Sequence, residues 1–437
     1  MEQTERHRHE TNATRCADAL EQALSSVPFY RGWRSRDPGP SRPVDERLRA
    51  LPVLSKRDLR TGVPFGFIHE SRSGREGFMS GEIELVATSG TASDRVSVTW
   101  NQPWWDRSES EAARLHPVLG RVFGGSHREA VLTSPVCAGN VCHVGRVAME
   151  QRVVNGLLFL NQANDPTTWD ASEVRRMVDE LDRFRPEVIE ADPAYLAILA
   201  RECTLAGLPV HQPACIVLTY EFPSLMHVRQ IRRAFPDVPL VSSYGSTETG
   251  HVFTRCDAGL FHQNGATCHV EIQPVRAARG DGRVGRILVT TLDNPWFALL
   301  RFDVGDLARL HVGPPCACGR DGGLVVEAIE GRVGDLTFDT EGRAVTVKRL
   351  DDALAAAEGI VGYRVEQSGA GRYAVRFVAE PGTAAAAADA LPGLMRTVYG
   401  GGAEVSVRAV SALAPEPSGK FRLAHTRFEW DPEALFS

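Results

Sequence analysis

Ser242-Ser243-Tyr244-Gly245-Ser246-Thr247-Glu248-Thr249-Gly250 follows directly on the apolar residues 239–241. An apolar run that ends in small and polar residues predicts a buried strand that breaks into a loop. In such a loop, a glycine lets the backbone approach a ligand, a tyrosine ring can stack on a base, hydroxyls can meet phosphates and a carboxylate can hold magnesium. The stretch therefore indicates a nucleotide site, although an ordinary polar loop after a strand would look the same.

Outward from this stretch, apolar runs alternate with amphipathic segments. The expected strands are residues 130–133, 187–190, 214–219 and 240–243, and the expected helices are residues 15–24, 103–122, 172–184, 194–206 and 224–235. Strands that alternate with helices predict a mainly parallel sheet covered by helices, in which ligands gather at the carboxyl ends of the strands. We therefore predict an α/β fold with a large N-terminal domain at residues 15–332, preceded by a disordered polar tail at residues 1–14.

The composition changes after residue 332, where a second pattern begins. Its expected elements are two paired strands within residues 363–379, a helix at 383–398 and a strand at 404–410. This pattern predicts a small, mobile C-terminal α/β domain at residues 333–437. The predicted domain contains Lys420, one of only three lysines in the chain, on a loop bounded by proline and glycine.

Length, composition and charge restrict the class of protein. The 437 residues carry a net charge of -6 and 43% hydrophobic residues, which is ordinary for a globular protein and argues against a nucleic-acid partner. No apolar run reaches the length of a membrane span, and the N-terminus lacks the apolar core of a signal peptide. The nine cysteines, an odd number, fit a reducing compartment better than a disulfide framework. We therefore expect a cytoplasmic monomer or homodimer that binds neither membrane nor nucleic acid.

A hydroxyl-rich tip, Thr88-Ser89-Gly90-Thr91, joins two predicted strands at residues 82–87 and 95–100. Backbone N–H groups and hydroxyls in such a tip can wrap phosphates. Further along the chain, Asp306 follows Gly305 and can accept two hydrogen bonds, as a ribose diol requires. Both features also occur for purely local reasons, because hydroxyl and carboxylate side chains readily bond to their own backbone.

Three thiols and one imidazole occur as two pairs that are far apart in the sequence. They are Cys256, His262, Cys316 and Cys318. Such a set can bind zinc tetrahedrally, and because all four positions would be filled by protein ligands, the predicted role is structural. Cys268 and His269 can compete as ligands, and the alternative to a metal site is a group of unpaired cysteines buried in the core.

Five motifs stand in order along the chain. They are Thr88-Ser89-Gly90-Thr91, Tyr244-Gly245-Ser246-Thr247-Glu248, Arg301-Phe302-Asp303-Val304-Gly305-Asp306, Gly331-Arg332-Val333-Gly334-Asp335 and Gly419-Lys420. In order and spacing they resemble the adenylate-forming superfamily of acyl-CoA synthetases and adenylation domains. Pro28-Phe29-Tyr30-Arg31 and Cys316-Ala317-Cys318-Gly319-Arg320 resemble the phenylacetate-CoA ligase branch in particular. The resemblance covers nearly the whole chain after about residue 24.

The resemblance implies a role for each matching residue. ATP or AMP would be bound by Thr88, Ser89, Gly90, Thr91, Tyr220, Glu221, Tyr244, Gly245, Ser246, Thr247 and Asp306. The catalytic group would comprise Lys420, Thr247, Glu248 and Arg332, with Glu248 as the magnesium ligand. The acid would be bound by Val136, Cys137, Asn140, Val141, Tyr220 and Gly245. In some members of the family, four cysteine and histidine residues that match Cys256, His262, Cys316 and Cys318 hold a structural zinc.

Three departures from the family pattern bear on these roles. Ala92-Ser93-Asp94-Arg95 replaces the usual glycine, lysine and proline of the phosphate loop, which predicts a weaker grip on pyrophosphate. Tyr220 would crowd the adenine or acyl pocket. Gly334 replaces the hinge aspartate, and the glycine- and asparagine-rich loop that serves thioester formation does not follow it. We therefore expect an acceptor step that does not depend strictly on CoA.

The implied function is activation of a small aromatic carboxylic acid to its adenylate, with ATP and magnesium. The acyl group would then pass to CoA, to a carrier-protein thiol or to an amine. The alternative is a catalytically degenerate member of the fold that binds nucleotide as a regulatory partner. Retention of Glu248, Asp306 and Lys420 together favours the enzyme.

Overall fold

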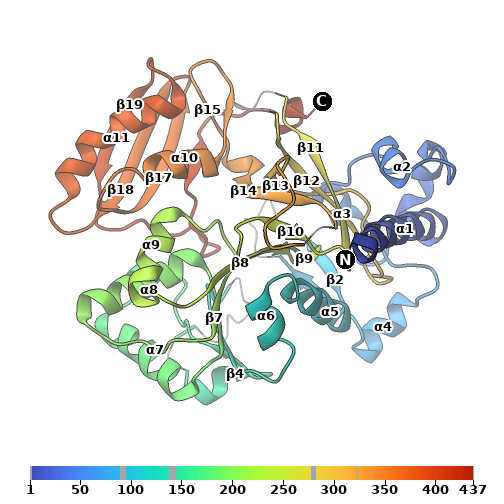
Figure 1. Cartoon of the computed structure of the whole chain (residues 1–437), viewed down its shortest axis with the longest axis horizontal. Coiled ribbons are helices and arrows are strands. Elements are labelled where there is room, and N and C mark those ends of the chain that lie inside the picture. The colour runs from blue at the N-terminus through green and yellow to red at the C-terminus, as the bar shows by residue number, and fades with distance from the viewer. Residues whose placement is uncertain are drawn as a thin grey trace. The chain divides into compact units, whose positions relative to one another are not determined.

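The computed structural model of the chain describes residues 2–88, 95–136, 144–145, 147–276, 282–320 and 322–436, with side chains from residue 12 onward. Figure 1 labels its α-helices and many of its strands. They form two compact units: the first comprises Met1–Gly124, Ser243–Gln273 and Gly285–Ala328, and the second comprises Gly125–Ser242, Pro274–Val284 and Ile329–Ser437. The residues predicted to form one large domain are therefore divided between the two units. Within the described ranges, no helix has the length and apolar character needed to cross a membrane.

The first unit begins with one long helix and several short ones. They are α1 (Glu2–Ser26), the 3-10 helix η1 (Pro28–Arg36), α2 (Val44–Ala50), α3 (Lys56–Gly62) and α4 (Gly74–Ser80). Helix α1 thus includes residues that the sequence analysis assigned to a polar tail. Helix α1 also makes a tertiary contact. The Asn12 side chain donates hydrogen bonds to the carbonyl oxygens of Gly265 and Cys268, at 2.6 and 3.2 Å.

The helix predicted at residues 103–122 is two helices, α5 (Gln102–Ala113) and α6 (Pro117–Val122). The prediction of one continuous helix was wrong because Pro117 has no N–H and disfavours helical geometry at the residue before it. His116 accordingly has an extended backbone, with φ -125° and ψ 130°.

The strands of the first unit are mostly antiparallel where their register is described. β1 (Glu84–Ala87) and β2 (Ser97–Trp100) form the predicted hairpin. The other strands are β8 (Leu240–Ser246), β9 (Gly250–Arg255), β10 (Phe261–Gln263), β11 (Cys268–Pro274), β12 (Val284–Thr291), β13 (Phe302–Leu310) and β14 (Val325–Arg332), in the order β11-β12-β13-β14-β10-β9-β8. The strand predicted to end at Ser243 continues to Ser246, because its last residues pair with β9 in an antiparallel hairpin.

The second unit contains the predicted parallel sheet, in the order β8-β7-β6-β3-β5-β4. Its elements are β3 (Glu129–Leu132), the 3-10 helix η3 (Met149–Arg152), β4 (Val153–Val154), β5 (Leu157–Phe159), the 3-10 helix η4 (Pro166–Thr168), α7 (Ala171–Phe184), β6 (Val188–Ala191), α8 (Pro193–Ala206), β7 (Cys215–Leu218) and α9 (Leu225–Ala234). Adjacent strands from β8 to β5 are parallel, and apolar side chains of α7, α8 and α9 form one core with the sheet. The predicted α/β fold class is confirmed.

The C-terminal part of the second unit is the smaller α/β arrangement that the sequence predicted. Its elements are the 3-10 helix η5 (Val333–Asp335), β15 (Thr337–Phe338), β16 (Ala344–Val345), α10 (Val347–Leu354), β17 (Ile360–Gly369), β18 (Arg372–Ala379), α11 (Ala384–Tyr399), β19 (Glu404–Ala409), β20 (Ala424–Thr426) and the 3-10 helix η6 (Pro432–Leu435). Figure 1 shows α10 and α11 beside β17, β18 and β19 in orange and red. With β20 these strands form one sheet, in the order β19-β18-β17-β20. Helix α9 contacts this part, since Gln230 donates to the carbonyl oxygen of Val361 at 2.8 Å.

A buried ion pair joins the edge of the parallel sheet to α7. The Arg152 side chain, just before β4, is fully buried and donates to the carboxylate of Glu180, whose side chain is 8% exposed. Arg176 donates to the other oxygen of that carboxylate at 2.6 Å. The guanidinium of Arg152 also donates to the carbonyl oxygens of Val147 and Leu160, at 3.1 and 3.3 Å, so its polar hydrogens are used inside the core.

We predict that Glu180→Ala lowers the free energy of unfolding by about 3 to 5 kcal/mol, because it leaves the charge of Arg152 buried without a counter-charge. Urea denaturation measures the difference. The matched control is Glu173→Ala, which removes the other carboxylate bound to Arg176 at a half-exposed site and should cost about 1 kcal/mol or less. Equal losses in the two variants would show that the Arg152 pair does not stabilise the sheet edge.

Candidate functional site

Tyr244 and Asp306 lie together in the first unit. The hydroxyl of Tyr244, in β8, donates to Oδ2 of Asp306, in β13, at 2.9 Å. Asp306 is half-buried and lies within β13. The glycine before it does have a positive φ of 87°, which distorts the strand locally. Tyr244 and Asp306 are therefore held together, and such a pair can contact the ring and the diol of one ligand.

The turn at Thr247–Thr249 connects β8 to β9 and contains Glu248. The Glu248 side chain is buried, with 5% exposure, and among the described residues it has no hydrogen-bond or ion-pair partner. A carboxylate oxygen is the kind of ligand that magnesium prefers, so Glu248 is a candidate for holding this cation. Ser246 instead closes the turn itself, because its Oγ lies 2.9 Å from Oγ1 of Thr249 and accepts the Thr249 N–H at 3.3 Å.

Gly245 is required by the approach of two backbones. A Cβ at this position would lie 2.2 Å from the carbonyl oxygen of Gly250 in the paired strand β9. A glycine is therefore required at position 245 by backbone packing, independently of any ligand.

Only one residue of the predicted phosphate loop can be placed. Thr88 is buried, and it bonds twice to Val96: its N–H donates to the carbonyl oxygen at 2.9 Å, and its Oγ1 accepts the Val96 N–H at 3.1 Å. Ser89, Gly90 and Thr91 lie outside the described residues. The same holds for Cys137, Asn140 and Val141 of the predicted acid pocket, whereas Val136 is half-buried.

His251 is a candidate that the sequence analysis missed. It pairs with Gly245 across the β8–β9 ladder, and residues that are directly opposite point to the same face of the sheet. Its Nδ1 lies 3.4 Å from Oγ of Ser243, its ring lies 5.0 Å from that of Trp105, and Trp105 lies 4.3 Å from Trp100. Burial lowers the pKa of His251 to about 4, so the ring is neutral near pH 7, and its buried Nε2 has no hydrogen-bond partner among the residues that the structure describes.

Lys420 lies in the second unit, on the loop between β19 and β20. Its Nζ donates to the carbonyl oxygen of Tyr220 at 3.4 Å, and the N–H of Phe421 donates to Oε1 of Glu221 at 2.7 Å. On the other side of the lysine, the carbonyl oxygen of Gly419 accepts the hydroxyl of Tyr195 at 2.9 Å. The loop is therefore docked on residues that follow β6 and β7.

Tyr220 has an unusual backbone for a tyrosine, with a positive φ of 69°. Its hydroxyl donates to the carboxylate of Glu190, which holds the ring over the carboxyl end of β6. Non-glycine residues in the left-handed region are uncommon and tend to occur at functional sites. This places the residue that departs from the family pattern beside Lys420.

The buried Asp192 and the half-buried Glu221 follow β6 and β7, where the Lys420 loop docks. Asp192 is 1% exposed and begins α8, where its Oδ1 accepts the N–H of Ala194 at 2.8 Å. Burial raises the pKa of Asp192 to about 7, opposed by that hydrogen bond and by the charge of Lys420. Burial likewise raises the pKa of Glu221 well above its usual value; Asp192 adds to this rise, while Lys420 and Arg332 oppose it.

The predicted hinge residues lie at the end of β14. Arg332 has an exposed side chain. Arg422 donates to the carbonyl oxygen of Gly334 and to Oδ1 of Asp335, both at 2.6 Å. Arg422, two positions after Lys420, therefore binds the segment that contains Gly334.

The first unit brings the four predicted metal ligands together. The ligand atoms of Cys256, His262, Cys316 and Cys318 all lie within 4.8 Å of one another. Cys256 Sγ is 3.6 Å from Cys316 Sγ, and Cys318 Sγ is 3.3 Å from Nε2 of His262. This donor set and spacing fit a tetrahedral metal ion.

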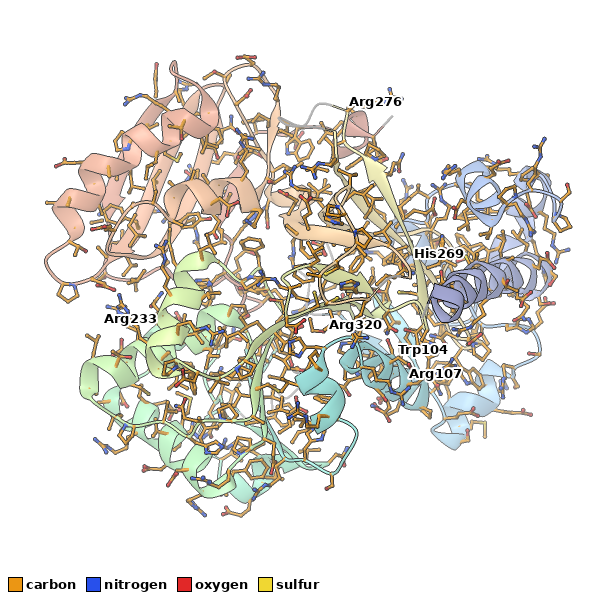
Figure 2. All side chains as sticks on the ribbon, viewed as in Figure 1. Trp104, Arg107, Arg233, His269, Arg276 and Arg320 are labelled. Carbon is orange, nitrogen blue, oxygen red and sulfur yellow. The ribbon has the colours of Figure 1, made fainter. Side chains whose placement is uncertain are left out.

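The two alternative ligands lie elsewhere. Cys268 is fully buried and its thiol donates to the carbonyl oxygen of Asn264 at 3.4 Å. His269, labelled in Figure 2, contacts Asn12 and Asp45 at the N-terminal helices, at 3.0 and 3.3 Å. Neither residue belongs to the four-ligand cluster.

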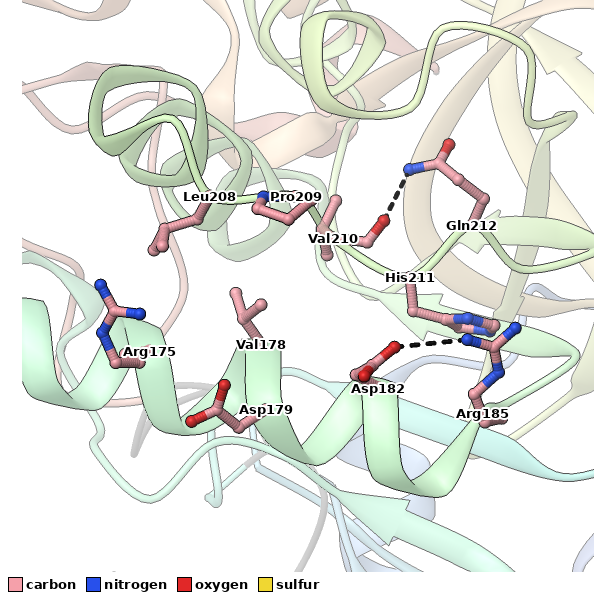
Figure 3. A pocket seen from close by; sticks show the side chains of 10 residues that line it. All are labelled: Arg175, Val178, Asp179, Asp182, Arg185, Leu208, Pro209, Val210, His211 and Gln212. Atoms are coloured by element: carbon pink, nitrogen blue, oxygen red, sulfur yellow. Dashed lines mark hydrogen bonds and ion pairs between the residues drawn. The ribbon is translucent and has the colours of Figure 1, made fainter.

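A groove of about 510 Å³ lies in the second unit between α7 and residues 208–212. Figure 3 shows its charged side chains along α7, including the ion pair of Asp182 with Arg185 at 3.3 Å. None of the predicted site residues lines this groove, so it is not part of the candidate site.

Comparison with curated proteins gives one informative relative. No protein-family model matches the chain. The phenylacetate-coenzyme A ligase of Thermus thermophilus is 27% identical over 310 residues, which is 67% of this chain. The match covers 63% of that ligase, which is less than two thirds of its length.

Comparison with solved structures identifies similar folds. A 2-hydroxyisobutyryl-CoA ligase in a postadenylation state has a TM-score of 0.72 over 96% of this chain and 90% of that chain, at 17% identity. The anthranilate CoA ligase AuaEII, in complex with anthranoyl-AMP, has a TM-score of 0.52 over 78% of this chain and 65% of that chain, at 13% identity. At these identities the likeness establishes the fold.

We predict that Gly245→Ala destabilises the chain by about 1 to 3 kcal/mol, the usual cost of forcing extra volume into packed structure, because the new methyl would meet the Gly250 carbonyl. Thermal and urea unfolding measure the loss. The control is Gly334→Ala, where a Cβ meets nothing within 4 Å, and where a change within about 0.5 kcal/mol is expected. Similar effects at both positions would contradict a structural requirement at Gly245.

Proposed function

We propose that this homologue of phenylacetate-coenzyme A ligase, which has the fold of the adenylate-forming ligases, activates a small aromatic carboxylic acid with ATP and transfers the acyl group to a thiol. The observation that carries the proposal is the docked loop, in which Lys420 lies beside Tyr220 and Glu221. A compact ammonium there can neutralise charge that develops on a carboxylate and an α-phosphate.

The proposed chemistry has two steps. In the first, a carboxylate oxygen attacks the α-phosphorus of ATP, the bond from that phosphorus to the bridging oxygen breaks, and pyrophosphate leaves. In the second, a thiolate attacks the acyl carbon, the bond between that carbon and the AMP oxygen breaks, and AMP leaves. The protein forms no covalent bond, so its contribution is alignment and charge neutralisation, for which we assign Lys420, Thr247 and Arg332.

For the nucleotide we assign Tyr244 to adenine and Asp306 to the ribose. Their mutual hydrogen bond leaves the phenol ring and a second carboxylate oxygen as the groups that would meet these moieties. Glu248 is the proposed magnesium ligand, since it is buried and lacks a partner among the described residues. Bound magnesium would neutralise phosphate charge.

The proposal of an aromatic acid rests on the face of β8 that contains Gly245. Opposite this glycine lies the neutral His251, flanked by Trp105 and Ser243. A flat acid with an amino or hydroxyl group suits such a set, because rings stack on tryptophan and the unpartnered nitrogen of His251 takes a hydrogen bond. A structurally similar ligase was solved with anthranoyl-AMP, an adenylate of this kind.

We propose CoA as the acceptor, since the similar proteins are CoA ligases by name. A carrier-protein thiol and an amine are the alternatives, because Gly334 and the segment after it depart from the family pattern. Measuring product formation from a preformed acyl-adenylate with CoA, with a carrier-protein thiol and with an amine distinguishes these three acceptors. If only the CoA thioester forms, the expectation that the acceptor step does not depend strictly on CoA is wrong.

The experiment that tests the function is release of pyrophosphate from ATP with a panel of aryl and aliphatic acids. We expect release with hydroxylated or aminated aryl acids. Binding of ATP without release for any acid would instead support a nucleotide-binding partner that has lost catalysis.

We predict that Lys420→Ala lowers the rate of adenylation by roughly a hundredfold or more, the scale seen when one charge-stabilising group is removed. ATP affinity and transfer from a preformed adenylate should remain, because Tyr244, Asp306 and Glu248 are intact. The control is Lys348→Ala, which removes a lysine paired with Asp352 on α10 and should leave the rate unchanged. A normal rate for Lys420→Ala would refute the assignment.

We also propose a structural zinc ion at the four-ligand cluster. Cys256 and His262 come from the end of β9 and from β10, while Cys316 and Cys318 come from the loop between β13 and β14, so a metal would join two segments that are distant in sequence. All four donors are supplied by protein, which leaves no open coordination position for catalysis.

We predict that Cys316→Ser reduces bound zinc from about one equivalent to well below it and lowers the melting temperature, because metal binding at such sites contributes to folding. Metal analysis of protein purified without added zinc gives the first result and calorimetry the second. Cys268→Ser is the matched control: its thiol is buried but lies outside the cluster, so zinc content should not change. Full zinc content in Cys316→Ser would reject the site.

A further inference from the structure

The loop of residues 416–420 is closed on itself. The N–H of Gly419 donates to the carbonyl oxygen of Glu416, and the N–H of Glu416 donates to the carbonyl oxygen of Lys420, both at 2.8 Å. Gly419 has a positive φ of 84°, which glycine adopts without strain in such a tight turn. Because the turn holds its own shape, contacts at a few of its backbone atoms determine where Lys420 lies.

The side chain of Lys420 does not fix this position by itself. Its Nζ donates to the carbonyl oxygen of Tyr220 at 3.4 Å, which is longer than the usual N–H···O distance of about 2.7 to 3.2 Å. The position of the lysine therefore depends on contacts made by the backbone of the neighbouring residues in the loop.

Tyr195, in the first turn of α8, provides one of these contacts. Its hydroxyl donates to the carbonyl oxygens of Gly419 and Asn164, each at 2.9 Å. The side chain is fully buried, and its ring lies edge-to-face with the rings of Trp169 and Phe421, with 6.0 Å between centroids in both pairs. Packing therefore fixes the ring, and the hydroxyl is the part that holds the loop.

Asn164, in the segment between β5 and η4, contacts the same loop. Its Nδ2 donates to the carbonyl oxygen of Pro417 at 3.2 Å, and its Oδ1 accepts the hydroxyl of Ser134. Ser134 lies just after β3, and its Oγ accepts the N–H of Val136 at 3.2 Å. Val136 is the first of the residues predicted to bind the acid. One chain of hydrogen bonds therefore joins the start of that segment to the loop of Lys420.

The loop fits closely against these residues. A Cβ on Gly419 would lie 2.2 Å from Oγ of Ser134 and 3.0 Å from the hydroxyl oxygen of Tyr195. Hydrogen bonds weaken steeply with misalignment, so a small displacement of the loop would break the contacts described above. Such displacements matter for catalysis, because a misplacement of about 1 Å can lower a rate about a hundredfold.

We propose that Tyr195 and Asn164 are positioning residues for Lys420: together they hold the loop of residues 416–420 against the segment that begins at Ser134, so that the ammonium meets the reacting groups in one arrangement. This inference rests on the proposed role of Lys420 in adenylation. Neither residue touches the reacting atoms in this scheme, since each contacts the backbone of the loop.

The test is Tyr195→Phe in the full chain, read by hydrogen exchange of the amides of Gly419 and Phe421. The change keeps the ring and its packing and removes only the hydroxyl. We expect roughly threefold to tenfold faster exchange than in the wild type, which is the change in an equilibrium that the loss of one neutral hydrogen bond produces. Asn164→Ala should act in the same direction, because it removes another bond to the loop.

The matched control is Tyr373→Phe. Tyr373, in β18, is also buried, and its hydroxyl also donates to a backbone carbonyl oxygen, that of Phe338. The unfolding midpoint should fall by a similar amount in the two tyrosine variants, whereas the loop amides should exchange at the wild-type rate in Tyr373→Phe. Wild-type exchange of the loop in Tyr195→Phe would overturn the inference, and so would equal acceleration in both variants.

Activity gives an independent reading. Tyr195→Phe should lower the rate of pyrophosphate release roughly tenfold, while the KM for ATP and the rate of transfer from a preformed adenylate remain unchanged. In the Lys420→Ala background the same change should have no further effect on pyrophosphate release, because Tyr195 acts through the lysine. A further decrease in that background, or equal losses in adenylation and transfer, would contradict a positioning role. If no acid supports pyrophosphate release, the proposed function fails, but the exchange measurements still decide whether Tyr195 and Asn164 hold the loop.

Discussion

The parallel ladder of β6, β7 and β8 is the constraint on which the rest of this structure depends. Its register sets Ala191 opposite Leu218 and Leu218 opposite Ser242, so three strands reach the same edge together. All four residues of β7 are buried, and a strand that is buried on both faces cannot carry a charge along its length. Along β7, polar chemistry is therefore confined to the residues that follow the strand.

The residues that follow β6 and β7 include Asp192 and Glu221. Burial raises the pKa of both carboxyl groups and so favours their neutral form. The amide of Ala194 at the start of α8 offsets part of this effect for Asp192, and the charge of Lys420 offsets a smaller part. The Lys420 loop is also held by neutral hydrogen bonds from Tyr195 and to Glu221.

In the first unit the strands are joined mainly by hairpins, so hairpin register decides which side chains lie together. The close pairing of Gly245 with β9 sets which residues share a face, and it separates Tyr244, bonded to Asp306, from His251, packed on Trp105. Two segments that are distant in the sequence meet at the cluster of three cysteines and one histidine. Small shifts in hairpin register would dismantle both arrangements, since one residue of slippage turns every side chain to the opposite face.

The sequence by itself determined the α/β class, the order of most helices and strands, the four members of the cysteine–histidine cluster and the loop position of Lys420. These follow from local causes: apolar periodicity, capping residues, glycine and proline positions, and motif order. It did not reveal the break before Pro117 or the extension of β8 to Ser246, which depends on pairing with β9. Only the tertiary structure decided that Lys420 contacts the carbonyl oxygen of Tyr220 and that His251 pairs with Gly245. Such contacts join residues that are separated in the sequence, and they are set by strand register and helix packing, which no local pattern encodes.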